Sequence, residues 1–294
     1  MGNNSKVALI VLNYNDYPTT SSFLERIKEF GLLDKIVVVD NHSSDESYRL
    51  LKAYENEKIE VIQTPYNGGY GYGNNYGIRY AYELYEPDFM IISNPDVIFE
   101  EHIIKRMIFE IEKDEKYSCI APMMRDINGN LVQGTAWRVP NALQYTLASG
   151  VLINKFFTLN KYRELKAGDS PNTIPVECLA GSFFMVKSKD MIEFGLYDES
   201  MFLYCEETYL GIQMKKNNKK MLLLTDEFFI HAHGISINKT YKSAIKKQWM
   251  VWKNKELIMR KHMDCSNLQV TLAHIFFCVC TIEQYLLSAF SKKA

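Results

Sequence analysis

Acidic and histidine side chains stand at points in this sequence where a buried segment ends or a helix begins. Asp40 and Asp96 each follow an apolar run, Glu206 and Glu207 are adjacent to each other, and His231 follows the run Phe228–Ile230. A carboxylate after a buried strand can accept a hydrogen bond from a ribose or a base, or can hold Mg²⁺ or Mn²⁺ beside phosphates. Paired glutamates can supply a general base. These residue types could therefore contact a nucleotide, hold a cation or transfer a proton.

The same residues have structural explanations that the sequence leaves open. An Asn-Pro-Asp turn needs no ligand, and acidic residues in a first helical turn are favourable with the helix dipole. Two histidines one residue apart, here His231 and His233, are as often structural as metal-binding. For Asp40 the alternative is a helix cap, a role that Asp45 already fits. The clusters therefore carry weight only in combination.

The elements that position these residues alternate between strand and helix. Because several of the strand candidates are apolar throughout, these must be covered on both faces, which is typical of a mostly parallel sheet flanked by helices in an α/β fold. Ligands bind outside the carboxyl ends of such strands. Those ends carry Asn13, Asp40, Asn67 and Asp96, so we expect one polar edge. The expected strands are 6–12, 35–40, 59–63 and 89–93, followed later by 182–187.

Local signals predict where the connecting helices begin and end. Thr19, Thr20 or Ser21 can cap a first helix that Gly31 would end, and Ser44 or Asp45 can cap a helix near 46–55. The stretch 125–175 is less regular, and we expect loops and a hairpin over the sheet there.

A glycine-rich segment, 67–75, precedes a helix that runs through Tyr85. Three glycines alternate from Gly69 to Gly73, but the last position of a G-x-G-x-x-G pattern is Asn74, and the segment follows the third strand instead of the first. There is also no P-loop pattern, which argues against a dinucleotide enzyme or a P-loop nucleotidase. The segment is either a tight turn that needs positive φ or a loop whose asparagines contact a sugar or base.

Composition sets broad limits on function. The chain has 294 residues, of which 47% are hydrophobic and 23% charged, as in ordinary globular proteins. Lys and Arg number 34 against 35 Asp and Glu, so there is no basic field for nucleic acid, and none is expected as a partner. The six cysteines lack zinc-site spacing and no signal peptide is evident, which predicts reduced thiols and a cytoplasmic protein.

The C-terminal part, 240–294, is predicted to be a helical extension of a catalytic domain formed by 1–239. Residues 240–263 carry seven Lys or Arg against one acid, Glu256, and an apolar stretch follows that is interrupted by His274 and Glu283. A glutamate makes a membrane-spanning helix unfavourable. Two alternatives remain open: attachment to an anionic membrane surface, here the inner face of the plasma membrane, or a helical hairpin that packs on the domain or forms a homodimer.

Taken together and in order, the motifs from Val7 to Ser236 resemble the family 2 glycosyltransferases, and in detail the bacterial rhamnosyltransferase-type members that build capsule, O-antigen or cell-wall polysaccharide. The segments that carry the resemblance are Val11–Asn15, Val38–Asp45, Asn67–Asn75, Asn94–Asp96, Leu179–Ser182, Phe202–Glu207 and His231–Ser236.

The resemblance implies an inverting enzyme of the GT-A type that uses a nucleotide diphosphate sugar and a divalent cation, Mn²⁺ or Mg²⁺. It implies that Asp96 binds the cation that bridges the diphosphate and that His231 completes this site. The residues implied to bind the nucleotide sugar are Leu12, Asn13, Tyr14, Asp40, Asn67, Gly69, Asn75, Asn94 and Asp96.

The resemblance also implies that Glu207 is the catalytic base and removes the proton of the acceptor hydroxyl, although Glu206 remains an alternative for this role. Gly181 and Ser182 are implied to lie near the acceptor, a glycan or lipid-linked glycan, and Glu206 and Trp137 are assigned to the same side.

Two departures from the family pattern favour a second hypothesis, a glycan-binding or scaffold subunit without turnover. Asn94 replaces the first acid of the family's D-x-D, and Tyr209 stands where an acid often follows the base. A third hypothesis, a nucleotidyltransferase, would require a glycine-rich loop where Asn13–Asp16 stands.

Overall fold

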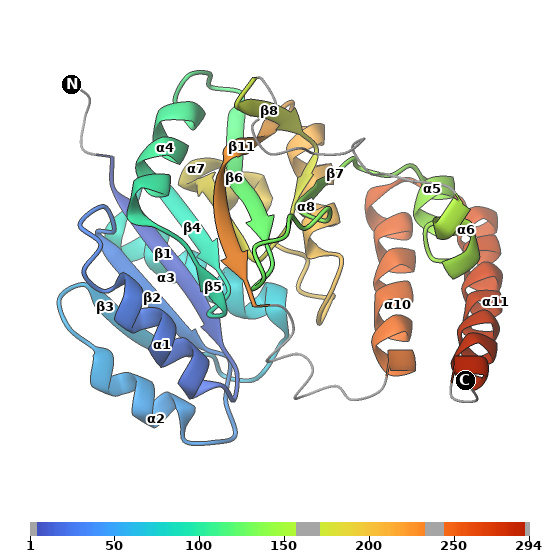
Figure 1. The fold of residues 1–294 in the computed structure, drawn as a ribbon, viewed down its shortest axis with the longest axis horizontal. Helices are drawn as coiled ribbons and strands as arrows, with labels where there is room; N and C mark the ends of the chain where they lie inside the picture. Colours follow the sequence, from blue (N-terminus) through green and yellow to red (C-terminus); the bar gives the residue numbers. More distant parts are fainter. Residues whose placement is uncertain (1–4, 157–170, 233–243, 292–294) are drawn as a thin grey trace.

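The computed structural model describes residues 5–156, 171–232 and 244–291, and it is built around one nine-stranded sheet (Figure 1). The parallel part of the sheet consists of the four strands predicted in the first hundred residues. Its strand order is β3 (Ile59–Gln63), β2 (Lys35–Asp40), β1 (Val7–Asn13), β4 (Phe89–Ser93), β10 (Phe183–Lys187), β6 (Tyr117–Arg125), β11 (Lys220–His231) and β5 (Val97–Ile98), with β8 (Thr173–Val176) paired to β11.

The direction of the strands changes halfway across the sheet. β3, β2, β1 and β4 are parallel neighbours, whereas β10 runs antiparallel to both β4 and β6. β11 returns parallel to β6 and antiparallel to β5. The expected α/β fold with a mostly parallel sheet is therefore confirmed, with a mixed second half. The antiparallel β10 starts at the edge where β4 ends, because Phe183 lies opposite Ser93.

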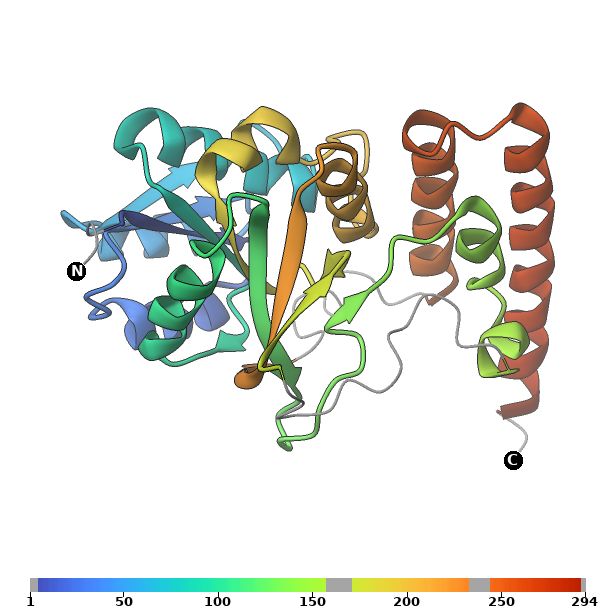
Figure 2. The same ribbon diagram turned by 90° about the horizontal axis from the view of Figure 1, so that it is seen from above.

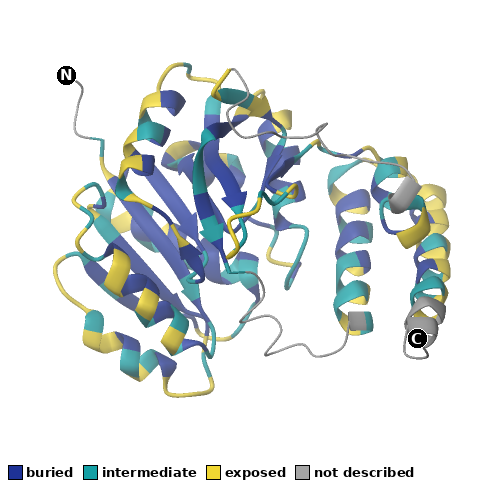
Figure 3. Cartoon of the chain, viewed as in Figure 1, coloured by how far each residue is buried: buried dark blue, intermediate teal, exposed yellow. Residues whose placement is uncertain are grey.

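Helices cover both faces of this sheet, and each face has its own apolar core (Figure 2). The strands β1, β2 and β4 are buried along almost their whole length, as Figure 3 shows, which explains why their sequences are mostly apolar. One face is covered by α1 (Tyr17–Ile27), α2 (Ser47–Leu51) with the 3₁₀ turn Lys52–Tyr54, and α4 (Glu101–Ile111). The other is covered by α3 (Tyr70–Tyr85), α7 (Ser188–Asp190) with the π turn Met191–Gly195, and α8 (Glu206–Lys216).

The predicted ends of the first helix are wrong. α1 begins at Tyr17, with Pro18 in its first turn, and it ends at Ile27, before Gly31. Proline preorganises a first helical turn, and the hydroxyl of Thr20 is used elsewhere, donating to Asn13 Oδ1 at 2.8 Å. The predicted caps of the second helix, Ser44 and Asp45, are also wrong, because the N-cap of α2 is Glu46; Asp45 accepts the backbone N–H of Ser47 at 2.9 Å from the position before it.

The glycine-rich segment is largely helix instead of loop, because α3 begins inside it at Tyr70. A Cβ atom on Gly73 would lie 2.4 Å from a methyl carbon of Leu12, so the absent side chain lets the helix approach the end of β1 closely. Only Gly69 has the positive φ, 92°, that the tight-turn interpretation requires.

The region 125–175 contains two helices that the sequence analysis did not anticipate. They are α5 (Ala142–Leu147), which begins with a capping box between Asn141 and Gln144, and α6 (Val151–Phe156). An antiparallel bridge between Arg125 and Leu131 forms a short chain reversal. The strand β7 (Ala136–Trp137) pairs with the distant β9 (Cys178–Leu179).

The C-terminal residues form two long antiparallel helices, α10 (Ala244–His262) and α11 (Asn267–Ser291), with α10 between the sheet domain and α11 (Figures 1 and 2). Trp252 of α10 is fully buried and stacks on Phe277 of α11, with ring centroids 5.7 Å apart. This third apolar core also includes Tyr145 of α5 and Tyr209 of α8. Within the described residues, no helix is long and apolar enough to cross a membrane.

Candidate active site

The carboxyl ends of the parallel strands form a hydrogen-bonded polar edge, as the sequence predicted. The register places Asn13 beside Asp40 and Asp40 beside Gln63. The fully buried Asp40 carboxylate accepts bonds from Asn13 Nδ2 (2.8 Å), from Gln63 Nε2 (3.0 Å), and from both the hydroxyl (2.6 Å) and the backbone N–H (2.9 Å) of Ser43. Four donors thus hold this carboxylate in one orientation. Leu12 and Tyr14, on either side of Asn13, are half-buried.

The loop after β3 is tied to this edge by Asn41, a residue that the sequence analysis did not single out. The Asn41 amide donates to Asn67 Oδ1 and to the Gly69 carbonyl oxygen, both at 3.0 Å. Asn67 Oδ1 also accepts the backbone N–H of Gly69 at 3.1 Å. Asn67 and Gly69, two of the residues predicted to bind the nucleotide sugar, are therefore adjacent to the ends of β1 and β2.

The start of α3 connects this edge with the chain that leads into α8. A Cβ atom on Gly69 would lie 1.9 Å from the carbonyl oxygen of Phe202, so only glycine fits there. The next backbone N–H, of Tyr70, donates to that same carbonyl oxygen at 2.8 Å. The Tyr70 hydroxyl donates to the carbonyl oxygen of Gly181 at 2.7 Å. Residues from three distant parts of the sequence therefore meet at the first turn of α3.

Asp96 and His231 are brought together by the pairing of β5 with β11. His231 lies opposite Val97 in this pairing, and its Nε2 atom is 3.1 Å from Asp96 Oδ1. The two residues are only 8% and 9% exposed. Asn94, at the start of the same turn, donates its backbone N–H to the carbonyl oxygen of Ser182 at 2.8 Å. His233 lies outside the described residues.

These two side chains fit a divalent cation that takes further ligands from a diphosphate. A carboxylate oxygen and an imidazole nitrogen already point at each other, and Mg²⁺ or Mn²⁺ commonly combines one or two protein ligands with substrate phosphate oxygens. In the described parts of the chain, no group of three or more His, Cys, Asp or Glu side chains could hold a metal ion. The donor set is therefore incomplete without a substrate.

Glu206 and Glu207 open α8, as expected, but their surroundings differ. Glu206 is buried, and its Oε1 atom has no hydrogen-bond partner among the described residues. Glu207 is half-buried and lies against Gly181, where an added Cβ atom would be 3.1 Å from Glu207 Oε1. Glu207 is therefore the more exposed of the two glutamates, and a side chain at 181 would crowd it.

Burial raises the pKa of both glutamates above the ordinary carboxyl value. For Glu206 the negative charge of Glu207 raises the pKa further. For Glu207 a backbone hydrogen bond from Gly181 acts in the opposite direction, without cancelling the effect of burial. The pKa of Tyr70 is also raised, first by burial and then by the charges of Glu207, Glu206 and Asp96.

The residues assigned to the acceptor side differ in their exposure and in their contacts. Trp137 is half-buried and donates its indole N–H to the hydroxyl of Thr208 on α8 at 3.4 Å. Ser182 follows Gly181 and is 6% exposed. Glu206 is 3% exposed, so its assignment to the acceptor side has no support in this geometry.

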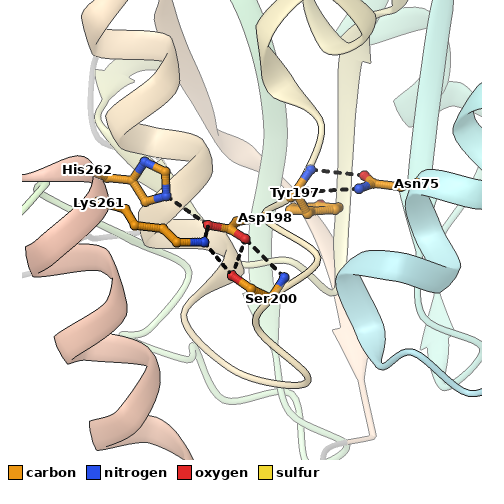
Figure 4. A network of polar contacts seen from close by, with 6 residues as sticks. All are labelled: Asn75, Tyr197, Asp198, Ser200, Lys261 and His262. Atoms are coloured by element: carbon orange, nitrogen blue, oxygen red, sulfur yellow. Dashed lines mark hydrogen bonds and ion pairs between the residues drawn. The ribbon is translucent and has the colours of Figure 1, made fainter.

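Asn75, assigned to the donor site, has a different set of partners in the structure (Figure 4). Its side chain is fully buried, accepts the backbone N–H of Tyr197 at 2.9 Å and donates to the Tyr197 carbonyl oxygen at 2.9 Å. Tyr70, which sequence reasoning missed, carries no distinguishing signal, because Tyr72 also stands between two glycines.

Comparisons with known proteins agree with this architecture. Residues 8–188 match the sequence model of the family described as Glycosyl transferase family 2. Among curated relatives, the low-salt glycan biosynthesis hexosyltransferase Agl10 of Haloferax volcanii is 26% identical over 212 residues, and the rhamnosyltransferase WbbL of Escherichia coli K12 is 22% identical over 267 residues. The matches cover 72% and 88% of this chain, and 62% and 97% of the two relatives. The match thus spans less than two thirds of the haloarchaeal protein.

Solved structures share the fold. One is the mannosyltransferase PcManGT of Pyrobaculum calidifontis in complex with GDP-Man and Mn²⁺, with a TM-score of 0.54 and 12% sequence identity. The likeness covers 99% of this chain and 80% of the mannosyltransferase.

Proposed function

The chain belongs to glycosyl transferase family 2, and we propose that it transfers a sugar from a nucleotide diphosphate to a hydroxyl group of a glycan or lipid-linked glycan, with inversion at the anomeric carbon. The observation that carries this proposal is the position of the segment Gly181–Ser182. A Cβ atom on Gly181 would lie 3.1 Å from Glu207 Oε1, and the carbonyl oxygen of Ser182 accepts the backbone N–H of Asn94, so the candidate base and the turn that carries Asp96 adjoin the same short segment.

The donor nucleotide is proposed to lie along the carboxyl edge of β1, β2 and the loop after β3. The side chains of Asn13 and Asp40 are hydrogen-bonded to each other there and hold a fixed position, and the half-buried Leu12 and Tyr14 can contact the nucleobase. Asn67 would close over the nucleotide from the loop. Asn75 is left out of this site because Tyr197 already satisfies its amide.

Asp96 and His231 are the residues proposed to hold a divalent cation together with the diphosphate. The cation, when bound, would neutralise the negative charge that develops on the leaving nucleotide diphosphate. The protein's own contribution is to fix the carboxylate and the imidazole 3.1 Å apart through the pairing of β5 with β11. Asn94 would orient this turn through its backbone bond to Ser182.

Glu207 is proposed to be the general base. As the acceptor oxygen forms its bond to C1 of the sugar, the bond from C1 to the phosphate oxygen breaks on the opposite face, and Glu207 takes the hydroxyl proton. A carboxyl pKa raised by burial is better matched to this proton transfer than an ordinary one. The more buried Glu206 is proposed to stay protonated, which leaves one negative charge, on Glu207, in the ground state.

The acceptor is proposed to approach over Gly181, Ser182 and Trp137. The absence of a side chain at Gly181 keeps the path to Glu207 open, and an indole ring is a suitable stacking surface for a sugar. Because the relatives are named as a rhamnosyltransferase and a hexosyltransferase of glycan biosynthesis, we propose a hexose or rhamnose as the transferred sugar and a surface polysaccharide as the product.

The outer surface of the C-terminal helices is proposed to attach the protein to the inner face of the plasma membrane. Lys246, Lys253 and Arg260 of α10 are exposed, and their positive charge complements anionic lipid. The outer face of α11 adds exposed apolar side chains, namely Leu268, Leu272, Ile275, Val279 and Ile282. Sedimentation with anionic vesicles, but not with neutral ones, is expected. A stable dimer that binds neither would contradict this proposal.

A donor screen tests the proposed reaction. The protein is incubated with Mn²⁺, nucleotide sugars of thymidine, uridine and guanosine, and glycan or lipid-linked acceptors, and the product's anomeric configuration is determined by NMR. We expect one donor to be consumed with inversion, and only in the presence of an acceptor. Binding of glycan without consumption of any donor would favour the scaffold hypothesis instead.

A further inference from the structure

The turn that leads into α8 has an unusual backbone. Tyr204 and Cys205 have φ values of 78° and 77°, so two successive residues with side chains adopt the left-handed region immediately before Glu206 and Glu207. Such conformations are unfavourable for residues other than glycine and persist only where the surroundings enforce them. The direction of both glutamates depends on this turn, because α8 starts from it.

The surroundings that enforce the turn belong to the C-terminal helix α10. The side-chain amide of Asn254 donates to the carbonyl oxygens of Leu203 (2.8 Å) and Tyr204 (2.9 Å). Asn254 is only 4% exposed, so these bonds form away from solvent. One turn earlier on α10, the carbonyl oxygen of Val251 accepts a weak bond from the thiol of Cys205 at 3.8 Å. Three consecutive residues of the turn are therefore bound by α10.

The peptide group between Leu203 and Tyr204 transmits this contact to the acidic pair. Its carbonyl oxygen, that of Leu203, accepts from Asn254 at 2.8 Å, and its N–H, that of Tyr204, forms a hydrogen bond that lowers the pKa of Glu206, against the larger effects of burial and of Glu207. The orientation of one peptide group therefore links α10 to the charge balance of the two glutamates.

The chain just before the turn is held between α3 and α10 (Figure 4). On the α10 side, Asp198 Oδ2 pairs with His262 Nε2 (2.9 Å) and with Lys261 Nζ (3.3 Å). Burial disfavours ionisation of Asp198, but hydrogen bonds from Ser200 and His262 outweigh it and hold its pKa well below the usual range. On the α3 side, Asn75 holds Tyr197 through both of its backbone groups.

α10 is itself firmly anchored, so it can serve as a fixed support. The ammonium group of Lys255, the neighbour of Asn254, is buried and donates to the Tyr145 carbonyl oxygen (3.0 Å) and to the Ser149 hydroxyl (2.8 Å). Trp252 stacks on α11 on the other side. These contacts fix the position of α10 along its axis and its rotation about that axis, and they thereby fix the position of the Asn254 amide.

We propose that Asn254 is a positioning residue for sugar transfer: its amide holds the left-handed turn 203–205 so that Glu207 is aimed at the acceptor. The inference rests on the proposed function, and it makes the C-terminal helices part of the catalytic apparatus. It requires a side chain with two N–H donors at 254, because two successive carbonyl oxygens are bound there.

Asn254→Asp tests this inference, because it keeps the shape of the side chain and removes both donors. The matched control is Asn217→Asp at the other end of α8, where the exposed amide donates to the Gln213 carbonyl oxygen at 2.9 Å. We expect Asn254→Asp to lower kcat by on the order of 10- to 100-fold through misplacement of the base, with the donor KM changed by less than about two-fold. Amide hydrogen exchange should accelerate in 202–208 only, and the control should leave all three readouts unchanged.

Relief of the backbone strain provides a rescue. Cys205→Gly supplies a residue that adopts positive φ without penalty, so the kcat loss caused by Asn254→Asp should be several-fold smaller in that background. An unchanged kcat or unchanged exchange in 202–208 would overturn the inference, and so would faster exchange throughout β1–β4, which indicates general destabilisation. If the wild-type protein consumes no donor, the proposed function fails, and the exchange in 202–208 alone decides whether Asn254 holds the turn.

Discussion

Two regions of this protein differ in how their polar groups are bound: the edge of the parallel strands that is proposed to bind the donor, called here the donor edge, and the turn 202–205 before the proposed base Glu207, called here the catalytic turn. At the donor edge the Asp40 carboxylate accepts four hydrogen bonds from its neighbours. At the start of α8, Glu206 has a buried oxygen without a partner among the described residues, and the pKa values of both glutamates are raised. A binding surface gains from side chains that are already ordered, whereas a group that must exchange a proton gains from incomplete stabilisation of its charge.

The two regions also differ in how they are supported. The donor edge is assembled by parallel strands and the loops that directly follow them, all within the first hundred residues. The catalytic turn is bound on one side by Gly69 and Tyr70, which lie more than a hundred positions before it in the sequence. On the other side it is bound by Asn254, which lies about fifty positions after it. Local sequence therefore determines the first region, and tertiary contacts determine the second.

Replacing the proposed base is expected to have the largest effect. Glu207→Gln should lower kcat by about 10³-fold, the range typical for loss of a general base, while the donor still binds. Glu206→Gln keeps the size and the proposed neutral state of its side chain, so kcat should fall by less than about tenfold. Steady-state kinetics of both variants checks this. The reverse ranking would assign the base to Glu206.

Asp96→Ala tests the donor side of the comparison. We expect kcat/KM to fall by about 10²-fold, because charge stabilisation at the leaving group is a large contribution to such reactions. The concentration of Mn²⁺ required for half-maximal rate should also rise. Titration with Mn²⁺ measures both effects. A variant with an unchanged metal requirement would show that Asp96 and His231 form only a structural ion pair.

Gly69→Ala tests the contact that joins the two regions. The positive φ and the Cβ position 1.9 Å from the Phe202 oxygen should together cost about 2 kcal/mol or more in the free energy of unfolding. Gly129 also has a positive φ, 83°, but nothing lies within 4 Å of its Cβ position, so Gly129→Ala should cost only about 1 kcal/mol. Urea denaturation measures the free energy of unfolding of both variants. Equal losses of this free energy would mean that the chain near Phe202 accommodates the added Cβ atom without cost.

A further prediction is a pH dependence of stability caused by Glu206. Because its pKa is raised in the folded protein, the native state binds more protons than the unfolded one, and this contribution to stability is lost as the pH rises through the raised pKa. Glu206→Gln removes the dependence. The melting temperature of the variant relative to wild type should therefore increase from about pH 5 to about pH 9. A constant difference would mean that Glu206 titrates normally.

The sequence was sufficient for the donor edge because its strands are short, largely apolar runs that end in a polar residue, as Leu12 is followed by Asn13. It was insufficient for the start of α3, because glycines disfavour helices and the close approach of Gly73 to Leu12 is a tertiary contact. Asn254 could not have been found from sequence. It lies among the lysines of a basic helix, and only the fold places its amide against Leu203 and Tyr204.

The most direct test of the donor site is a thermal-shift screen of nucleoside diphosphates, with and without Mn²⁺, on the wild-type, Asp96→Ala and Glu207→Gln proteins. A ligand at about 100 times its Kd stabilises the native state by about 2.7 kcal/mol, and each kcal/mol should raise the melting temperature by roughly 2–4 °C. The account predicts a Mn²⁺-dependent rise in the wild type and in Glu207→Gln that is lost in Asp96→Ala. No rise with any nucleotide, or an equal rise in Asp96→Ala, would contradict it.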